Sequence, residues 1–190
     1  MVRVGLVGED PNDTSSIKNL IEKRYKKTVR FYPLAKNVKG YHLDSIKIKN
    51  VLRTEFADKK CHFVVYIRDL DALKSEKAKL QEKINWFKNL DTVTNNKGVL
   101  LLNIWELEAL IFGDIATFNS IYKLKYKPKQ APTYIKEPKE VLKKITSGSN
   151  KKFNESDCPD LFKKLDIDKI EETCECFKDF IENFEKRLNE

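Results

Sequence analysis

Short apolar runs alternate with helix-like stretches over the first 118 residues, and this alternation restricts the fold. Residues 2–7, 62–67 and 98–104 are short and apolar, as expected of strands buried on both faces. Residues 15–26 repeat apolar side chains at spacings of three and four, and residues 74–87 form a lysine-rich helical stretch. A further strand is expected over residues 28–33 and a helix around residues 43–56. The pattern predicts an α/β fold, a mostly parallel sheet flanked by helices.

The length of 190 residues favours one domain. We expect residues 1–118 to form the α/β core and residues 119–190 a basic loop and helical C-terminal extension of the same domain. Residues 122–139 combine lysines, tyrosines and three prolines, which predicts a surface loop. Residues 171–188 place phenylalanines on one side of an amphipathic helix that closes the chain.

Acidic side chains follow three of the expected strands. The carboxyl ends of parallel strands line one crevice, so acids that are far apart in sequence can converge there. Converging carboxylates repel one another unless a cation lies among them, and oxygen ligands suit Mg²⁺ or Mn²⁺. The candidate metal ligands are Glu9, Asp69, Asp71, Glu106 and Glu108, with Asp13 as a supporting acid.

The spacing within two of these acidic groups adds a geometric expectation. On extended backbone, residues two apart point to the same side, so Asp69 and Asp71 can both face one metal ion. Glu106 and Glu108 can do the same if their strand continues through them. A helix would instead place each pair on opposite faces.

Lysine and arginine outnumber acids by 37 to 29, which gives a formal charge of +8. Such a charge attracts polyanions, and nucleic acid is the leading partner. A lysine-rich solubilising surface remains the alternative. The candidate contacts to a nucleic-acid backbone are Lys36, Lys39, Lys74, Lys127 and Lys129.

The cysteines and the N-terminal residues indicate the cellular compartment. We expect Cys61, Cys158, Cys174 and Cys176 to be free thiols, and Cys174 and Cys176 lack a second ligand pair at zinc-site spacing. The first residues lack the layout of a signal peptide, and no apolar stretch approaches the roughly 20 residues that cross a bilayer. A soluble, cytoplasmic protein without membrane contact is expected.

Three segments carry a resemblance to a known group of proteins. They are Val7-Gly8-Glu9-Asp10-Pro11-Asn12-Asp13, Asp69-Leu70-Asp71 and Glu106-Leu107-Glu108-Ala109. Together they resemble the Toprim-like families found beside AAA/ABC-type ATPases in bacterial anti-phage and abortive-infection loci, most closely a small family with a Glu-x-Glu-Ala segment. The resemblance covers most of the chain and implies a Toprim-like, Rossmannoid fold.

By this resemblance Glu9 matches the invariant glutamate after the first strand, Asp69 and Asp71 match the Asp-x-Asp pair, and Asp13 matches an acid of the same loop. Asp10 departs from the pattern, because a glycine is commoner there. The resemblance implies a Mg²⁺-dependent nuclease with Glu9, Asp69 and Asp71 as catalytic residues, Glu9 moving a proton.

Its implied substrate is DNA or RNA, tRNA included, and its implied role is that of a toxic effector gated by an ATPase subunit. A homodimer is left open. The alternative is a non-catalytic Toprim-like module that binds nucleic acid or an ATPase partner and regulates it. A nucleotide-binding P-loop is absent, because Gly8-Glu9-Asp10 does not continue into a glycine-rich Lys-Ser/Thr turn.

Overall fold

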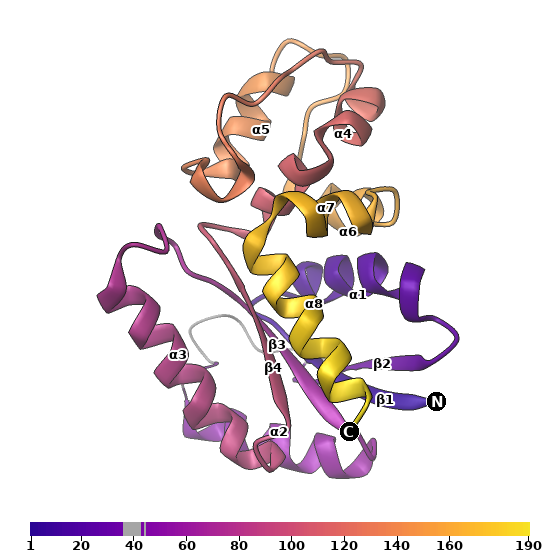
Figure 1. Cartoon of the computed structure of the whole chain (residues 1–190), viewed down its shortest axis with the longest axis vertical. Coiled ribbons are helices and arrows are strands. Elements are labelled where there is room, and N and C mark those ends of the chain that lie inside the picture. The colour runs from indigo at the N-terminus through magenta and orange to yellow at the C-terminus, as the bar shows by residue number, and fades with distance from the viewer. Residues whose placement is uncertain (36–42, 44) are drawn as a thin grey trace.

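A computed structural model describes residues 1–35, 43 and 45–190. Four parallel strands form one sheet in the order β2-β1-β3-β4 (Figure 1). This confirms the expected α/β class and gives a Rossmann-like arrangement in which all described strand pairs are parallel. The strands are β1 (Val2–Val7), β2 (Val29–Pro33), β3 (Phe63–Asp69) and β4 (Gly98–Asn103).

Helices cover both faces of the sheet, and alternate residues of each strand supply the two cores. On one face, Val4 and Leu6 of β1 share the larger apolar cluster with α1 and α8. On the other face, Val7 joins a smaller cluster with α2 and the end of α3. The flanking helices are α1 (Pro11–Tyr25), α2 (Ile46–Asp58), α3 (Lys77–Asp91) and α8 (Glu175–Leu188).

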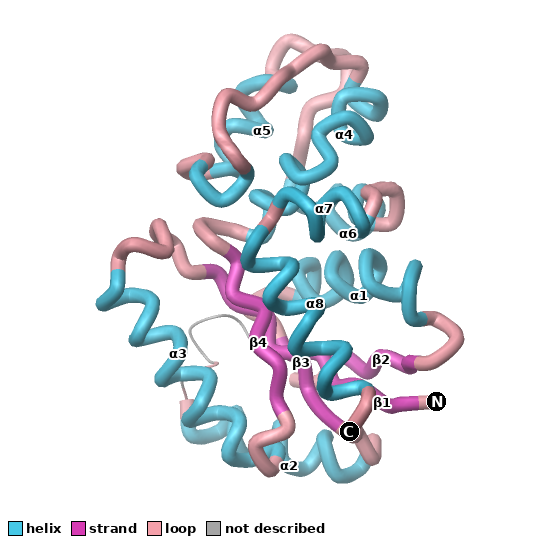
Figure 2. Tube along the Cα trace, viewed as in Figure 1, coloured by secondary structure: helices cyan, strands magenta, loops and turns pink. Residues whose placement is uncertain are grey.

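The segment after β4 forms a helical lobe and then returns to the sheet (Figures 1 and 2). Position 118, where we expected the core to end, lies inside α4, and α8 packs on the sheet as part of the main core. The elements are η3 (Leu107–Asp114), α4 (Ile115–Tyr122), η4 (Pro132–Tyr134), α5 (Pro138–Thr146), η5 (Glu155–Asp157), α6 (Cys158–Phe162) and α7 (Ile167–Thr173), with η2 (Thr92–Thr94) between α3 and β4.

The first helix begins earlier than the sequence pattern indicated. Asp10 caps it, because its Oδ1 accepts a hydrogen bond from the Asn12 backbone N–H at 2.7 Å. Asp13 completes the capping box by accepting from the Asp10 N–H at 3.1 Å, and Pro11 occupies the first helical position. The expected start at residue 15 is therefore wrong, and Asp13 lies in the first turn of α1.

The last expected helix is divided. Residues 171–188 do not form one helix, because Cys174 adopts an extended backbone with φ −116° and ψ 97°. The chain turns there from α7 into α8. The two helices then pack differently, with α7 against η3 and α1 and α8 against β4.

Gly98, the first residue of β4, lies in a crowded site. Its backbone N–H donates to Oδ2 of Asp91 at 3.0 Å, and the other oxygen of Asp91 accepts from the Thr94 hydroxyl at 2.5 Å. A Cβ atom at position 98 would come within 2.5 Å of Asp91 Oδ1 and 2.7 Å of a ring carbon of Tyr66. Only glycine fits this start of β4 without displacing its neighbours.

We therefore expect Gly98→Ala to lower the free energy of unfolding by about 1–3 kcal/mol, the usual cost of overpacking a core. Urea unfolding followed by circular dichroism measures this change. Gly148→Ala is the matched control, because nothing lies within 4 Å of a Cβ at that position. Equal stability of the two variants would contradict the close fit around Gly98.

Candidate functional site

A polar hollow of about 310 Å³ lies at the carboxyl end of the sheet. Glu9 reaches it from the loop after β1, Asp69 is the last residue of β3, and Glu108 comes from η3 after β4. Three strand ends therefore contribute carboxylates to one place. The residues around the hollow are Glu9, Asp10, Asn12, Asp13, Asp69, Glu108, Lys139, Glu155 and Cys158.

Asp69 is held by a neighbour from the adjacent strand. It pairs with Asn103 across the β3–β4 register, and Oδ1 of Asp69 accepts a hydrogen bond from the Asn103 side-chain amide at 2.9 Å. Burial raises the pKa of Asp69 well above its usual range, and the charge of Asp13 adds to this, although the bond from Asn103 acts in the opposite direction. Asn103 is itself fully buried, and within the described part of the chain its Oδ1 has no hydrogen-bond partner.

Asp13 and Glu108 share this environment. Burial, followed by repulsion from Glu108, raises the pKa of Asp13 to about 7. Burial also raises the pKa of Glu108. Carboxylates so placed gain stability from either a proton or a cation, so the hollow has an electrostatic preference for positive charge.

Lys139 is the basic residue in the lining of the hollow, and it lies at the start of α5. Its Nζ lies 3.5 Å from Glu106 and 3.7 Å from Glu155, and its backbone N–H donates to Glu106 at 3.2 Å. Burial alone would lower the pKa of Lys139, but Glu106 and Glu155 outweigh it and raise that pKa. Lys139 therefore stays charged, and Glu106, its ion-pair partner, is not among the described residues that line the hollow.

Glu9 is held by an arginine from the central strand. Nε of Arg68 lies 2.6 Å from Oε1 of Glu9. The guanidinium of Arg68 also lies over the Trp86 ring of α3, 4.5 Å from its centroid. Arg68 therefore links Glu9 to helix α3.

Asp71 does not join the other acids. Strand β3 ends at Asp69, and Asp71 adopts a left-handed backbone with φ 55°. Its side chain is 64% exposed and lies 3.4 Å from Nζ of Lys83. The expectation that Asp69 and Asp71 face one metal is wrong, because the extended backbone it required stops two residues earlier.

Glu106 and Glu108 also differ from their expected arrangement. Strand β4 ends at Asn103, and Trp105 then takes a left-handed backbone with φ 62°. Glu106 precedes η3 and contacts Lys139, whereas Glu108 lies in the first turn of η3 and lines the hollow. Of this pair, Glu108 is the one placed among the strand-end acids.

The ligand types of the hollow fit a hard divalent cation, since Glu9, Asp13, Asp69 and Glu108 all offer oxygen. Their geometry is not that of a formed metal site. Among the described residues, no group of three or more His, Cys, Asp or Glu side chains is arranged to hold a metal ion. Coordination would require these carboxylates to draw together.

The expected basic contacts are scattered. Lys74 pairs with Glu175 at 3.2 Å and with Asp179 at 3.9 Å, away from the acidic hollow. Lys127 and Lys129 line a separate hollow of about 360 Å³ that shares no lining residue with the acidic one. Lys36 and Lys39 lie outside the described residues.

Sequence reasoning missed the residues that come from distant elements. Asn103 supports Asp69, and both end neighbouring strands, which is the signal that could have identified this pair. Glu155 and Cys158 reach the hollow only through the packing of η5 and α6. Burial and then Glu108 raise the pKa of Cys158, so this thiol stays protonated.

All four cysteines are free, as expected. In the described part of the chain, no helix is long and apolar enough to span a membrane.

Comparison with known protein families identifies the family of this chain. Residues 9–185 match the family described as "Domain of unknown function (DUF4276)", and the chain therefore belongs to that family. No curated protein and no solved structure matches the chain.

The pKa of Asp13 predicts how stability depends on pH when no divalent cation is present. An unfolded Asp loses its proton near 3.8, and folded Asp13 loses it near 7. Between these values the folded state holds a proton that the unfolded state has released. The contribution of Asp13 to the free energy of unfolding therefore falls as pH rises from about 4 to about 7 and is constant above that.

Asp13→Asn keeps the acceptor of the capping box and removes this titration. We expect it to flatten the pH dependence of unfolding and to stabilise the protein at pH 8 by at least about 1 kcal/mol. Urea unfolding in chelator across this pH range measures the effect. Asp71→Asn removes the same charge from an exposed side chain and is the matched control. An unchanged slope for Asp13→Asn would show that Asp13 is not repelled in the folded state.

Proposed function

We propose that this member of the family is a Toprim-like nuclease that uses Mg²⁺ or Mn²⁺ to hydrolyse phosphodiester bonds of DNA or RNA, tRNA among them. The observation that carries the proposal is the convergence of Glu9, Asp69 and Glu108 from three strand ends on one hollow. Sites built from several carboxylates at strand ends are suited to chemistry on phosphates with a divalent cation.

The side chains placed to hold the cation are Asp13, Asp69 and Glu108. Burial raises the pKa of each, and repulsion from the others in this group adds to the pKa of Asp13 and Asp69, so a bound cation would relieve that repulsion. The cation would supply charge neutralisation for the phosphate oxygens during hydrolysis. Asn103 holds Asp69 in place, which fixes the orientation of this proposed ligand.

Glu9 is the residue proposed to move a proton. Its carboxylate lines the hollow and forms an ion pair with Arg68. The ion pair limits the positions that the carboxylate can occupy, as a general base requires. Lys139 lies at the rim among acids and is placed to contact an anionic phosphate.

The place of this nuclease in a defence system rests on the sequence resemblance. We propose that a cytoplasmic AAA/ABC-type ATPase subunit gates it and that it acts as the toxic effector. One observation favours the alternative of a non-catalytic regulatory module. Among described residues the carboxylates are not arranged as a metal site, and Glu9 is already paired with Arg68. Cleavage by the purified protein with its ATPase separates the two functions.

Glu9→Gln tests the proposed chemistry, because it keeps the side-chain shape and removes the charge. We expect at least about a 100-fold loss of strand cleavage, the scale of losing a positioned acid or base. Folding and nucleic-acid binding should persist. The assay includes the ATPase or measures toxicity in cells, with Mg²⁺ or Mn²⁺ present.

Glu22→Gln makes the same substitution on the solvent side of α1 and should leave cleavage unchanged. Full cleavage or full toxicity by Glu9→Gln would reject the catalytic role of Glu9 and favour the regulatory module.

Metal binding distinguishes the two aspartates of the Asp-x-Asp pair. We expect Asp69→Asn to weaken Mn²⁺ binding at least about tenfold, since it removes the strand-end carboxylate while keeping an acceptor for Asn103. Asp71→Asn should bind Mn²⁺ as the wild type does, because its side chain faces solvent and Lys83. Isothermal titration calorimetry measures both affinities. Equal weakening by both variants would restore Asp71 to the metal site.

A further inference from the structure

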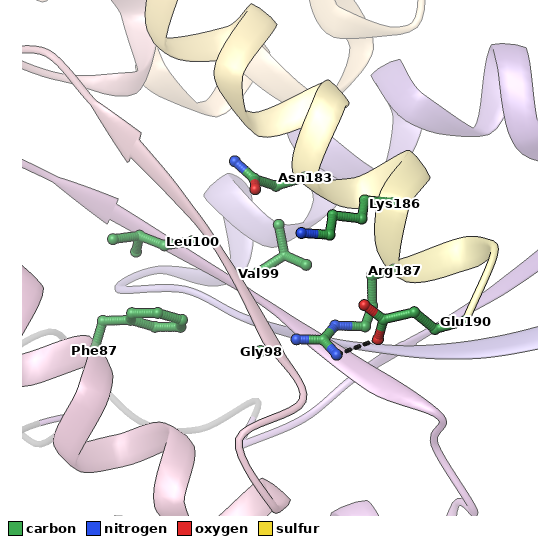
Figure 3. Close-up of a pocket in the computed structure, with 8 residues that line it drawn as sticks. All are labelled: Phe87, Gly98, Val99, Leu100, Asn183, Lys186, Arg187 and Glu190. Atoms are coloured by element: carbon green, nitrogen blue, oxygen red, sulfur yellow. Dashed lines mark hydrogen bonds and ion pairs between the residues drawn. The ribbon is translucent and has the colours of Figure 1, made fainter.

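Strand β4 is an open edge of the sheet. In the described part of the chain it pairs with β3 alone, and bonds such as Val64 N–H to Lys97 O show that its odd-numbered residues face β3. The backbone groups of Leu100 and Leu102 therefore point outward, since successive residues of a strand alternate in direction. Figure 3 shows this edge between α3 and α8.

The two edges of the sheet differ in composition. The other edge strand, β2, carries an exposed Arg30 and ends in Pro33, both of which discourage pairing with another strand. Strand β4 reads Gly-Val-Leu-Leu-Leu-Asn and contains neither charge nor proline. An apolar edge of this kind is a ready template for a further strand.

Helix α3 leaves an unfinished apolar stripe beside this edge. Leu80, Ile84 and Phe87 recur at spacings of four and three, and all three are half-buried. Leu80 packs near Leu102, and Phe87 lines a hollow of about 290 Å³ with Leu100. We call these five residues the β4 edge surface.

The charges along the edge are divided by sign. At the Gly98 end, Lys186 and Arg187 of α8 line the hollow together with Glu190, which pairs with Arg187, and Lys97 is exposed beside it. At the opposite end, Glu175 and Asp179 of α8 lie beside Lys74. Along α8 itself, basic side chains therefore lie where β4 begins, and acidic side chains lie where it ends.

We infer that the occupant of this edge is a second copy of the chain. A two-fold axis beside Leu101 would pair β4 with β4 of the other copy in antiparallel orientation, with Leu100 opposite Leu102. Each polar outward group of these residues then gains a partner, and the sheet continues from one copy into the other. The same axis brings the two α3 stripes together on one face.

The division of charge supports this occupant specifically. Antiparallel pairing places the basic end of each copy opposite the acidic end of the other, so the same favourable charge contact forms twice, once on each side of the axis. The two acidic hollows then open at opposite ends of the strands, because the strands of the two copies run in opposite directions. The inference does not depend on the proposed nuclease activity.

A charge-swap series tests the interface by analytical ultracentrifugation. The wild type is expected to sediment as a dimer. Lys97→Glu with Lys186→Glu should raise the dimer dissociation constant at least about tenfold, and Glu175→Lys with Asp179→Lys should do the same. The variant that combines all four changes should recover dimerisation, because its charges are complementary again.

Lys178→Glu is the control, since Lys178 lies seven residues from Glu185, on the α8 flank that contacts Tyr25 of α1. It should leave the dimer unchanged. Ile84→Lys gives an independent variant on the half-exposed stripe and should also weaken the dimer. Amide hydrogen exchange adds a second measurement, with Leu100 and Leu102 protected only in the dimer.

A wild type that remains monomeric at about 0.1 mM would overturn the inference. A dimer that withstands both charge reversals and Ile84→Lys would also overturn it, since that dimer would use another surface. Circular dichroism confirms that each variant is folded before its association is judged.

Discussion

The Asp69 carboxylate is buried at the end of the central strand, and the candidate site depends on how that carboxylate is compensated. Asn103 reaches it from β4, so the register of two strands fixes its position. The negative charges of Asp13 and Glu108 raise its pKa further after burial. Among the described residues, no basic side chain is shown in an ion pair with it. The fold therefore maintains a concentration of acid that a proton or a divalent cation can stabilise.

Basic side chains around this centre pair with its outer acids. Arg68 and Lys139 each hold a carboxylate at the rim, Glu9 in one case and Glu106 in the other. Lys143 further engages Glu155 at 3.0 Å. The outer acids are thus paired with basic residues, whereas the inner acids repel one another. This arrangement of charges suits a site that must bind a cation and an anionic substrate together.

Strand β4 serves two surfaces through the alternation of its residues. Its odd-numbered side chains face the α8 core and end with Asn103, which supports the site. Its even-numbered residues, Leu100 and Leu102, carry the outward backbone and contact the α3 side. A single strand thus joins the candidate site to the β4 edge surface, and Trp86 of α3, stacked on Arg68, forms a second connection.

The sequence by itself determined the parallel α/β fold and the placement of Glu9, Asp69 and Glu108 at the ends of strands or beyond them, because apolar runs and their breaks are local properties. The tertiary structure alone decided which acids meet. Asp71 turns away through a left-handed backbone, and Asp13 enters the site because the Asp10 cap starts α1 early. Lys139 and Glu155 come from the helical lobe, where no predicted strand end marks them as site residues. These outcomes depend on backbone dihedrals and on packing between distant segments, which the order of residue types does not specify.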